Sequence, residues 1–223
     1  MKPVLIIGAG GHAKVLADAL LASGRQVLGF VERIDKAGYQ KEVLPGLLVL
    51  GTDAVLSSYA PSEVELVNGL GGVDCVGSRR RVQTKLEADG WNFSGVCHPA
   101  AKVSLFASVS VGVQLLAGCI VQAGARIDVG SIINTAAIVE HDSTLEKFVH
   151  VAPRAVLCGN THVGLNSHIG AGSIVLQGLT LGPNTMVGAG AVIVKDFEGY
   201  GTLIGVPARC SDLNPPELKL DIV

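Results

Sequence analysis

The sequence predicts a small α/β domain followed by a parallel β-helix, and three observations lead to that prediction. An aliphatic residue recurs every six positions through the second half of the chain, and a strand, a glycine turn and a helix open the first half. Glycine supplies 29 of 223 residues, about twice its usual share. The 17 basic and 19 acidic residues give a net charge of −2, which offers no electrostatic attraction for nucleic acid or an anionic membrane.

The N-terminal part alternates between short apolar runs and helical patterns, as a small α/β domain does. Residues 4–7 and 27–31 are predicted strands, and residues 13–22 are the predicted helix between them. The alternation continues in three later segments, 47–50, 63–67 and 79–88. We therefore expect one domain over residues 1–97 and the β-helix over residues 98–209.

A glycine turn joins the first predicted strand to the first predicted helix. Gly8, Gly10 and Ala13, with Glu32 after the second strand, match the spacing of a dinucleotide-binding turn, in which bare backbone and a helix N-terminus hold phosphates. The domain is Rossmann-like but short, so a phosphate-bearing ligand is favoured over NAD-dependent hydride transfer. A purely structural turn is the remaining interpretation, and His12 in the turn serves either packing or a phosphate.

The six-residue repeat defines the second domain. Sixteen consecutive aliphatic residues follow this spacing: Val103, Val109, Leu115, Val121, Ile127, Ile133, Val139, Leu145, Val151, Leu157, Val163, Ile169, Val175, Leu181, Val187 and Ile193. A period of six suits a short strand and a corner, and three such units make an 18-residue coil that stacks about 4.8 Å from the next. The aliphatic residues are expected to point inward, and the small residues four places after them to occupy the corners.

The apolar composition does not indicate a membrane protein. Residues 155–194 contain no Lys, Arg, Asp or Glu, but glycine, asparagine and proline interrupt them too often for a spanning helix. Five cysteines without a CxxC pair predict neither a disulfide framework nor a zinc ribbon, and no signal-peptide core is recognised, so we expect a cytoplasmic protein. Residues 210–223 are polar and broken by prolines, which predicts a C-terminal extension.

One histidine directly precedes an acid. Asp142 could accept the Nδ1 proton of His141 and raise the basicity of Nε2, as a general base requires, although an ordinary surface turn is the alternative. His150 follows nine residues later, which is half a coil. The two imidazoles therefore lie on different sides of the coil, and they can share one site only between two subunits.

Two further features of the repeat leave alternatives open. His168 follows His150 by 18 residues and is expected to stack on it, with His162 on another side, so a metal site is one alternative. Cys158, next to Gly159, could carry an acyl group. Small residues are what corners accommodate, so a structural Cys158 is favoured.

Several motifs together resemble one family. They are the opening run GAGGHAKVL, Asn134-Thr135, the segment VEHD at 139–142, the segment FVHVAP at 148–153, and Gly159. From residue 1 to about residue 210 the chain is similar to the hexapeptide-repeat nucleotide-sugar acetyltransferases, which include bacillosamine and perosamine N-acetyltransferases and sialic acid O-acetyltransferase-like proteins. The resemblance implies a left-handed β-helix and a homotrimer with active sites between subunits. It also implies acetyl-CoA as co-substrate and no metal; the zinc-binding hexapeptide-repeat carbonic anhydrases have two histidines five apart, which this chain lacks.

The same resemblance assigns catalytic roles. His141 matches the general base that takes a proton from the attacking sugar amine, and Asp142 matches its acidic partner. The backbone N–H of Gly159 matches the donor that faces the acetyl carbonyl, where negative charge develops.

Residues for the two substrates are implied in the same way. For coenzyme A they are His150, near the thioester, together with Gly159, Ala171 and Ala189. For the nucleotide sugar they are Gly10, Gly11, His12, Glu32, Arg33 and Gly69. Members of the family often carry two acidic residues where this chain has Glu32-Arg33, so a uridine-binding pattern is in doubt and a guanine nucleotide is allowed.

The function implied is direct transfer of acetyl from acetyl-CoA to the amino group of a nucleotide-linked 4-amino-4,6-dideoxy sugar, such as GDP-perosamine or a UDP-linked amino sugar. Two alternatives remain at this point. One is a sugar O-acetyltransferase of the sialic acid type, and the other is a non-catalytic β-helix trimer.

Overall fold

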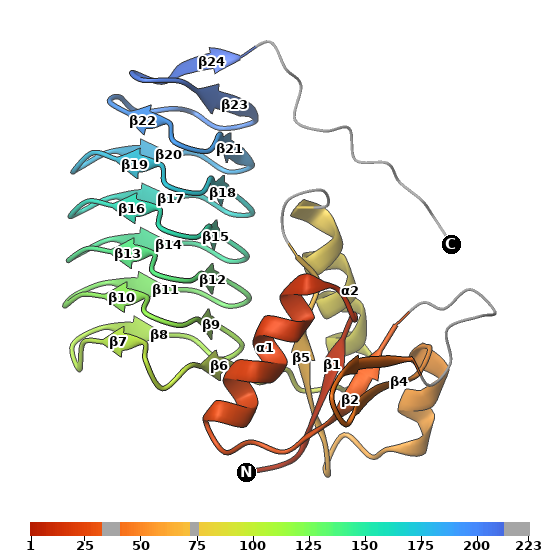
Figure 1. Cartoon of the computed structure of the whole chain (residues 1–223). Coiled ribbons are helices and arrows are strands. Elements are labelled where there is room, and N and C mark those ends of the chain that lie inside the picture. Colours follow the sequence, from red (N-terminus) through yellow and green to blue (C-terminus); the bar gives the residue numbers. More distant parts are fainter. Residues whose placement is uncertain (33–40, 72–75, 212–223) are drawn as a thin grey trace. The chain divides into compact units, whose positions relative to one another are not determined.

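A computed structural model describes residues 1–32, 41–71 and 76–211. The chain divides into two compact units (Figure 1), the first formed by residues 1–71 and 78–99 and the second beginning at Ala100. The first unit is an α/β domain and the second is a parallel β-helix, as the sequence predicts. No helix in these described ranges is both long and apolar enough to cross a bilayer.

The first unit is built on one sheet. Its strands are β1 (Val4–Ile7), β2 (Val27–Val31), β3 (Glu42–Leu44), β4 (Leu47–Gly51) and β5 (Glu65–Asn68), in the order β3-β4-β2-β1-β5. All pairs are parallel except β3 with β4. The remaining elements are α1 (Gly11–Ala22), the 3-10 helix η1 (Asp53–Ser58), α2 (Val76–Ala88) and β6 (Val96–Cys97). The predicted alternation is confirmed, while β3 and η1 were not expected from the sequence.

Strand β1 lies in the core of this unit, with apolar residues packed on both of its faces. All four of its residues are buried, which is the pattern of a parallel strand covered on both faces. Leu5 and Ile7 join a cluster that includes Leu86 of α2. The helix α1 packs on β1 and β2 and buries Leu16 and Leu20.

The strand order reverses direction beside β1. The chain passes from β1 to β2 on one side and later returns to β5 on the other. In open α/β sheets, ligands bind outside the carboxyl ends of the strands at such a switch point. Gly8 follows β1 there, and Gly69 follows β5.

The second unit consists of short strands stacked as rungs, visible in Figure 1 from β7 in green to β22 in blue. One sheet contains β7 (Lys102–Val103), β10 (Ile120–Val121), β13 (Ile138–Val139), β16 (Val156–Leu157), β19 (Ile174–Val175) and β22 (Val192–Ile193). The next contains β8 (Ser108–Val109), β11 (Arg126–Ile127), β14 (Thr144–Leu145), β17 (His162–Val163) and β20 (Thr180–Leu181). The third includes β9 (Gln114–Leu115), β12 (Ile132–Ile133), β15 (His150–Val151), β18 (His168–Ile169) and β21 (Thr185–Val187) among its strands.

The predicted inward residues form the core of the β-helix. Val121 pairs with Val139 and Val139 with Leu157, so like positions stack one coil apart. Fourteen of the sixteen predicted residues are buried in one cluster. The two exceptions lie in the first coil, where Val103 is partly buried and Val109 is 36% exposed. Because β8 is the terminal strand of its sheet, Val109 has no coil before it to pack against.

The far end of the stack is closed by an antiparallel pair. The strand β23 (Gly201–Ile204) continues the third sheet, and β24 (Arg209–Ser211) pairs with it in the antiparallel sense. Cys210 and Ser211 are therefore part of this sheet, although the sequence placed them in a C-terminal extension. Residues 212–223 lie outside the described residues.

Candidate active site

A hydrogen-bonded histidine–aspartate pair follows β13. His141 Nδ1 donates to Asp142 Oδ2 at 2.9 Å, and the two side chains are 63% and 65% exposed. This is the arrangement that the sequence predicted for the pair. Because Nδ1 carries the donated proton, Nε2 is left with the lone pair, which suits a proton acceptor.

The corner of the coil fixes the backbone of this pair. Asp142 has φ +60°, a left-handed conformation that aspartate tolerates better than most residues. Gly124, Asn160 and Gly178 occupy the same corner in neighbouring coils, with φ +76°, +56° and +72°. The position is thus a regular turn of the fold, and the aspartate is accommodated without a special distortion.

Gly159 lies one coil beyond His141 and packs against its ring. A Cβ atom on Gly159 would stand 2.5 Å from His141 Nε2 and 2.6 Å from Cε1, so any side chain here would displace the imidazole. Gly159 is buried, and its N–H donates to no backbone carbonyl within the described residues. A proton acceptor and an uncommitted backbone donor therefore lie side by side.

His150 lies on a different sheet from His141 and is held by two contacts. Asn134 Nδ2 donates to His150 Nε2 at 3.0 Å, and the ring of His168 meets it edge-to-face with centroids 4.8 Å apart. The predicted stacking of the two histidines is confirmed by their strand register. Burial lowers the pKa of His168, because it disfavours the charged form of the ring. Asn134 contributed to the resemblance, but its contact with His150 was not predicted.

The expected coenzyme A positions fall on another corner from the dyad. Ala171 and Ala189 are exposed and stack one coil apart, with Gly190 N–H donating to Ala171 O at 2.9 Å. They follow the third sheet, which carries His150, whereas His141 and Gly159 follow the first sheet. A single chain therefore does not bring these two groups together.

The expected nucleotide-sugar residues gather at the carboxyl edge of the first unit. Gly10 and Gly11 are exposed at the start of α1, His12 is half-buried, and this end has neither a side-chain cap nor an acidic residue in its first turn. Glu32 Oε2 accepts a hydrogen bond from Ala9 N–H at 2.8 Å, so it holds the glycine turn against the end of β2. Arg33 lies outside the described residues.

Gly69 closes this edge from β5. Its N–H donates to Ile7 O at 2.8 Å. A Cβ built on Gly69 would lie 2.6 Å from the side chain of Ile6 and 2.9 Å from the Cβ of Ala13. Only glycine permits this close approach of β5 to β1 and α1. The lack of a side chain at residue 69 is therefore what allows these elements to pack this closely.

The histidines of the metal alternative are not all brought together. His162 lies on the second sheet, where Nε2 is 3.1 Å from Glu146 Oε1, while His150 and His168 lie on the third. Within the described ranges no group of three or more His, Cys, Asp or Glu side chains could hold a metal ion. Cys158 is half-buried at its corner, where Ser143 Oγ donates to its carbonyl at 3.1 Å.

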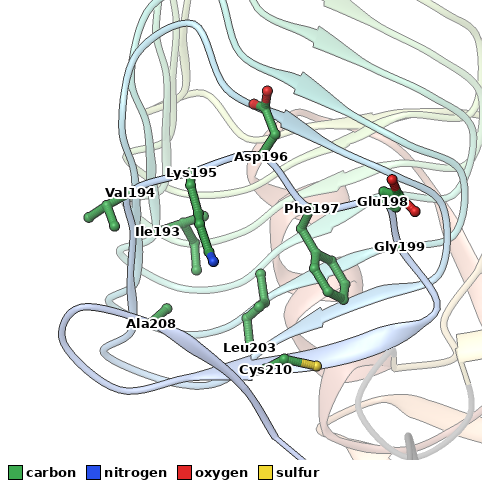
Figure 2. Close-up of a pocket in the computed structure, with 10 residues that line it drawn as sticks. All are labelled: Ile193, Val194, Lys195, Asp196, Phe197, Glu198, Gly199, Leu203, Ala208 and Cys210. Carbon is green, nitrogen blue, oxygen red and sulfur yellow. The ribbon is translucent and has the colours of Figure 1, made fainter.

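A pocket of about 420 Å³ opens at the last coil (Figure 2). In Figure 2 its lining residues include Phe197 and Leu203, with Lys195 and Cys210 nearby. None of the predicted site residues lines this pocket. The exposed side chains of His141 and Asp142 lie outside this pocket.

Comparisons with known proteins identify relatives over nearly the whole chain. Residues 3–86 match the family described as the PglD N-terminal domain. The acetyltransferase domain of PglB from Neisseria gonorrhoeae FA1090 is 36% identical, with 95% of this chain and 100% of that chain covered and a TM-score of 0.85.

A second relative comes from Caulobacter crescentus. PerB, crystallised with CoA and GDP-perosamine, is 34% identical, with coverage of 95% and 98% and a TM-score of 0.85. A histidine-to-alanine variant of GDP-perosamine N-acetyltransferase from the same organism, also in complex with CoA and GDP-perosamine, matches at 32% identity, with coverage of 95% and 97% and a TM-score of 0.86. From its glycine turn, its repeat and these relatives, the chain belongs to the hexapeptide-repeat nucleotide-sugar acetyltransferases, acyl-CoA-dependent enzymes that join a Rossmann-like domain to a left-handed β-helix.

Proposed function

We propose that the protein transfers the acetyl group of acetyl-CoA to the amino group of a nucleotide-linked 4-amino-4,6-dideoxy sugar. Two relatives support this choice of reactants. The PglB domain has been crystallised with acetyl coenzyme A, and PerB with CoA and GDP-perosamine. The transfer is direct, and no covalent acyl-enzyme is formed.

His141 is the general base of the proposed reaction. The sugar amine attacks the thioester carbonyl, and His141 Nε2 accepts the proton that the nitrogen loses. Asp142 stabilises the imidazolium through the 2.9 Å bond to Nδ1. When the carbon–sulfur bond breaks, the imidazolium gives its proton to the leaving thiolate, so the products are the amide and CoA with a free thiol.

The backbone N–H of Gly159 is the proposed oxyanion donor. The carbonyl oxygen gains negative charge as the amine attacks, and a fixed donor stabilises that charge in the transition state. The close packing of the His141 ring on Gly159, where a Cβ would meet Nε2, is the observation that carries the proposal. One reacting carbon can then be reached by both groups.

A relative supports a catalytic rather than a binding role for the histidine. The Caulobacter crescentus enzyme has been crystallised with CoA and GDP-perosamine after one of its histidines was replaced by alanine, and likewise by asparagine. In that enzyme, ligand binding survives loss of the imidazole. We expect the same of His141 in this chain.

The nucleotide phosphates are proposed to bind at the start of α1. Gly10 and Gly11 leave the first helical N–H groups accessible, and the helix N-terminus favours negative charge. His12 lies beside these glycines, and Gly69, which follows β5, adds no side chain at this edge of the sheet. The carboxylate of Glu32 holds the glycine turn through its hydrogen bond from Ala9 N–H. Arg33 is the proposed cation beside the nucleotide.

A homotrimer is proposed because one chain separates the two halves of the site. His141 and Gly159 lie on one corner, while His150, Ala171 and Ala189 lie along another face. The first sheet of the β-helix also carries a column of outward-facing aliphatic side chains that a single chain leaves at least partly exposed. They are Ile120, Ile138, Val156, Ile174 and Val192. A neighbouring subunit that covers this column would bring its own coenzyme A face to the dyad.

A thiol-release assay with a panel of sugar nucleotides tests the proposal. We expect acetyl-CoA turnover with 4-amino-4,6-dideoxy sugars linked to GDP or UDP, and none with the matching 4-hydroxy sugars. In H141A and H141N, kcat should fall about 10²- to 10⁴-fold, because general-base help is worth that much. The Kd for CoA, measured by calorimetry, should stay unchanged.

Two results would refute this proposal. A hydroxy sugar that outperforms every amino sugar would make the protein an O-acetyltransferase. An H141A enzyme within about threefold of wild type would remove His141 from the mechanism, since a base contributes far more than that.

A further inference from the structure

Gly124 lies directly beneath the aspartate of the dyad. It occupies the same corner one coil before Asp142, and Asp142 N–H donates to Ala123 O at 3.1 Å, which ties the two coils together. A Cβ built on Gly124 would overlap Asp142 Oδ1, and it would lie 3.3 Å from the carboxylate carbon. The carboxylate thus occupies the space that a side chain at 124 would need.

Backbone conformation alone does not require glycine here. Gly124 has φ +76°, but other corner positions hold non-glycine residues at similar values, including Ala136 at +55° and Phe148 at +58°. In the same corner as Gly124, Asp142 and Asn160 adopt φ +60° and +56°. Room for the carboxylate distinguishes Gly124 from these neighbours.

We propose that Gly124 is a positioning residue for catalysis, which keeps the Asp142 carboxylate on Nδ1 of His141 by leaving room for that carboxylate. The inference rests on the proposed role of the dyad. Gly124 touches no reacting atom in this scheme. It acts only through the direction in which the carboxylate points.

A methyl group at this position should change activity more than stability. The atom it meets is the end of a flexible side chain that is 65% exposed, so the carboxylate can rotate toward solvent at little cost. That rotation breaks the 2.9 Å bond to His141. The imidazole then loses the partner that orients it and stabilises its protonated form.

Gly178 is a matched control within the same corner. Its φ of +72° is close to that of Gly124, so alanine at either position meets the same backbone strain. A Cβ on Gly178 would have no neighbour within 4 Å. The pair G124A and G178A therefore differs in the contact with Asp142 and not in the backbone conformation.

The experiment compares G124A, G178A and D142A, with G124A and G178A also made in the D142A background. We expect kcat of G124A to fall about tenfold or more below that of G178A, the usual effect of losing a partner that orients a functional histidine. KM for acetyl-CoA and the melting temperature should match between the two. In the D142A background the added G124A change should cost no more than G178A does, because the carboxylate is already gone.

Asparagine variants at the same two positions keep the test valid if the alanine variants do not fold. Asn160 and Asn166 adopt positive φ in this fold, so G124N and G178N remove most of the backbone strain while adding the same Cβ. Equal kcat values for the Gly124 and Gly178 variants would overturn the inference. If D142A lowers kcat while G124A does not, only the inference about Gly124 fails. If D142A leaves kcat unchanged, the proposed role of the dyad fails with it.

Discussion

At the scale of single residues, the candidate site depends on glycines that lack side chains as much as on the side chains of His141 and Asp142. The proposed proton acceptor is His141, and glycines on neighbouring coils leave room for it and for its partner. Gly159 makes room for the ring, and Gly124 makes room for the carboxylate that bonds to it. Stacking at a fixed register brings these small residues to the dyad, since equivalent positions meet every 18 residues.

The buried His168 gives the fold a pH dependence. Burial lowers its pKa below the ordinary value of 6.5, so the unfolded chain binds a proton more readily than the folded chain. This residue's share of stability is therefore complete above pH 6.5 and is lost as pH falls through that value. We expect urea unfolding between pH 8 and pH 5 to show a decline of up to about 1.4 kcal/mol per pH unit from this group, and H168F to reduce that slope. An unchanged slope in H168F would show that His168 does not titrate on unfolding.

Residue contacts could be predicted where sequence neighbours make them, or where the repeat sets the spacing, as it does for His150 and His168. His141 and Asp142 are adjacent, so their hydrogen bond follows from local geometry. The bond from Asn134 to His150 spans 16 residues, and that from Ala9 to Glu32 spans 23. Contacts of this kind need the register of the coils or the order of the strands, which the residue types alone do not specify.

At the scale of elements, the β-helix was more predictable than the α/β domain. A repeat of six determines both the strand spacing and the inward residues. Its prediction of buried residues failed only at the first coil, where Val109 has no coil before it. In the first unit, β3 has only three residues and η1 is a short 3-10 helix, so neither shows a periodic pattern. The end of the β-helix was also placed early, because the antiparallel return of β24 breaks the repeat.

The outward aliphatic column of the first sheet predicts where subunits meet. Ile174 of β19 is 37% exposed within this column. We expect I174E to dissociate the oligomer, because a charge buried at an apolar interface has no partner to offset its desolvation. Light scattering after size exclusion measures the mass.

Ser108 of β8 provides the control for that experiment. It also faces outward and is exposed, but it lies on the second sheet. The S108E variant should keep the mass of the wild type. A trimer that survives I174E would place the subunit contact elsewhere.

At the scale of the whole molecule, the chain divides its chemistry between faces that it cannot bring together alone. The proposed base and the proposed oxyanion donor follow the first sheet, and the histidine expected near the thioester lies on the third. In a cyclic oligomer each subunit presents one face to the neighbour on one side and a different face to the neighbour on the other. Three complete sites can then form from three incomplete chains.

Mixed oligomers of H141A and H150A test this arrangement most directly. Each variant alone lacks one half of every site, so both should be nearly inactive. After co-expression, random mixing should give about a quarter of the interfaces an intact His141 from one subunit and an intact His150 from its neighbour. The mixture should recover about that fraction of wild-type kcat. A mixture no more active than either variant alone would contradict a site shared between subunits.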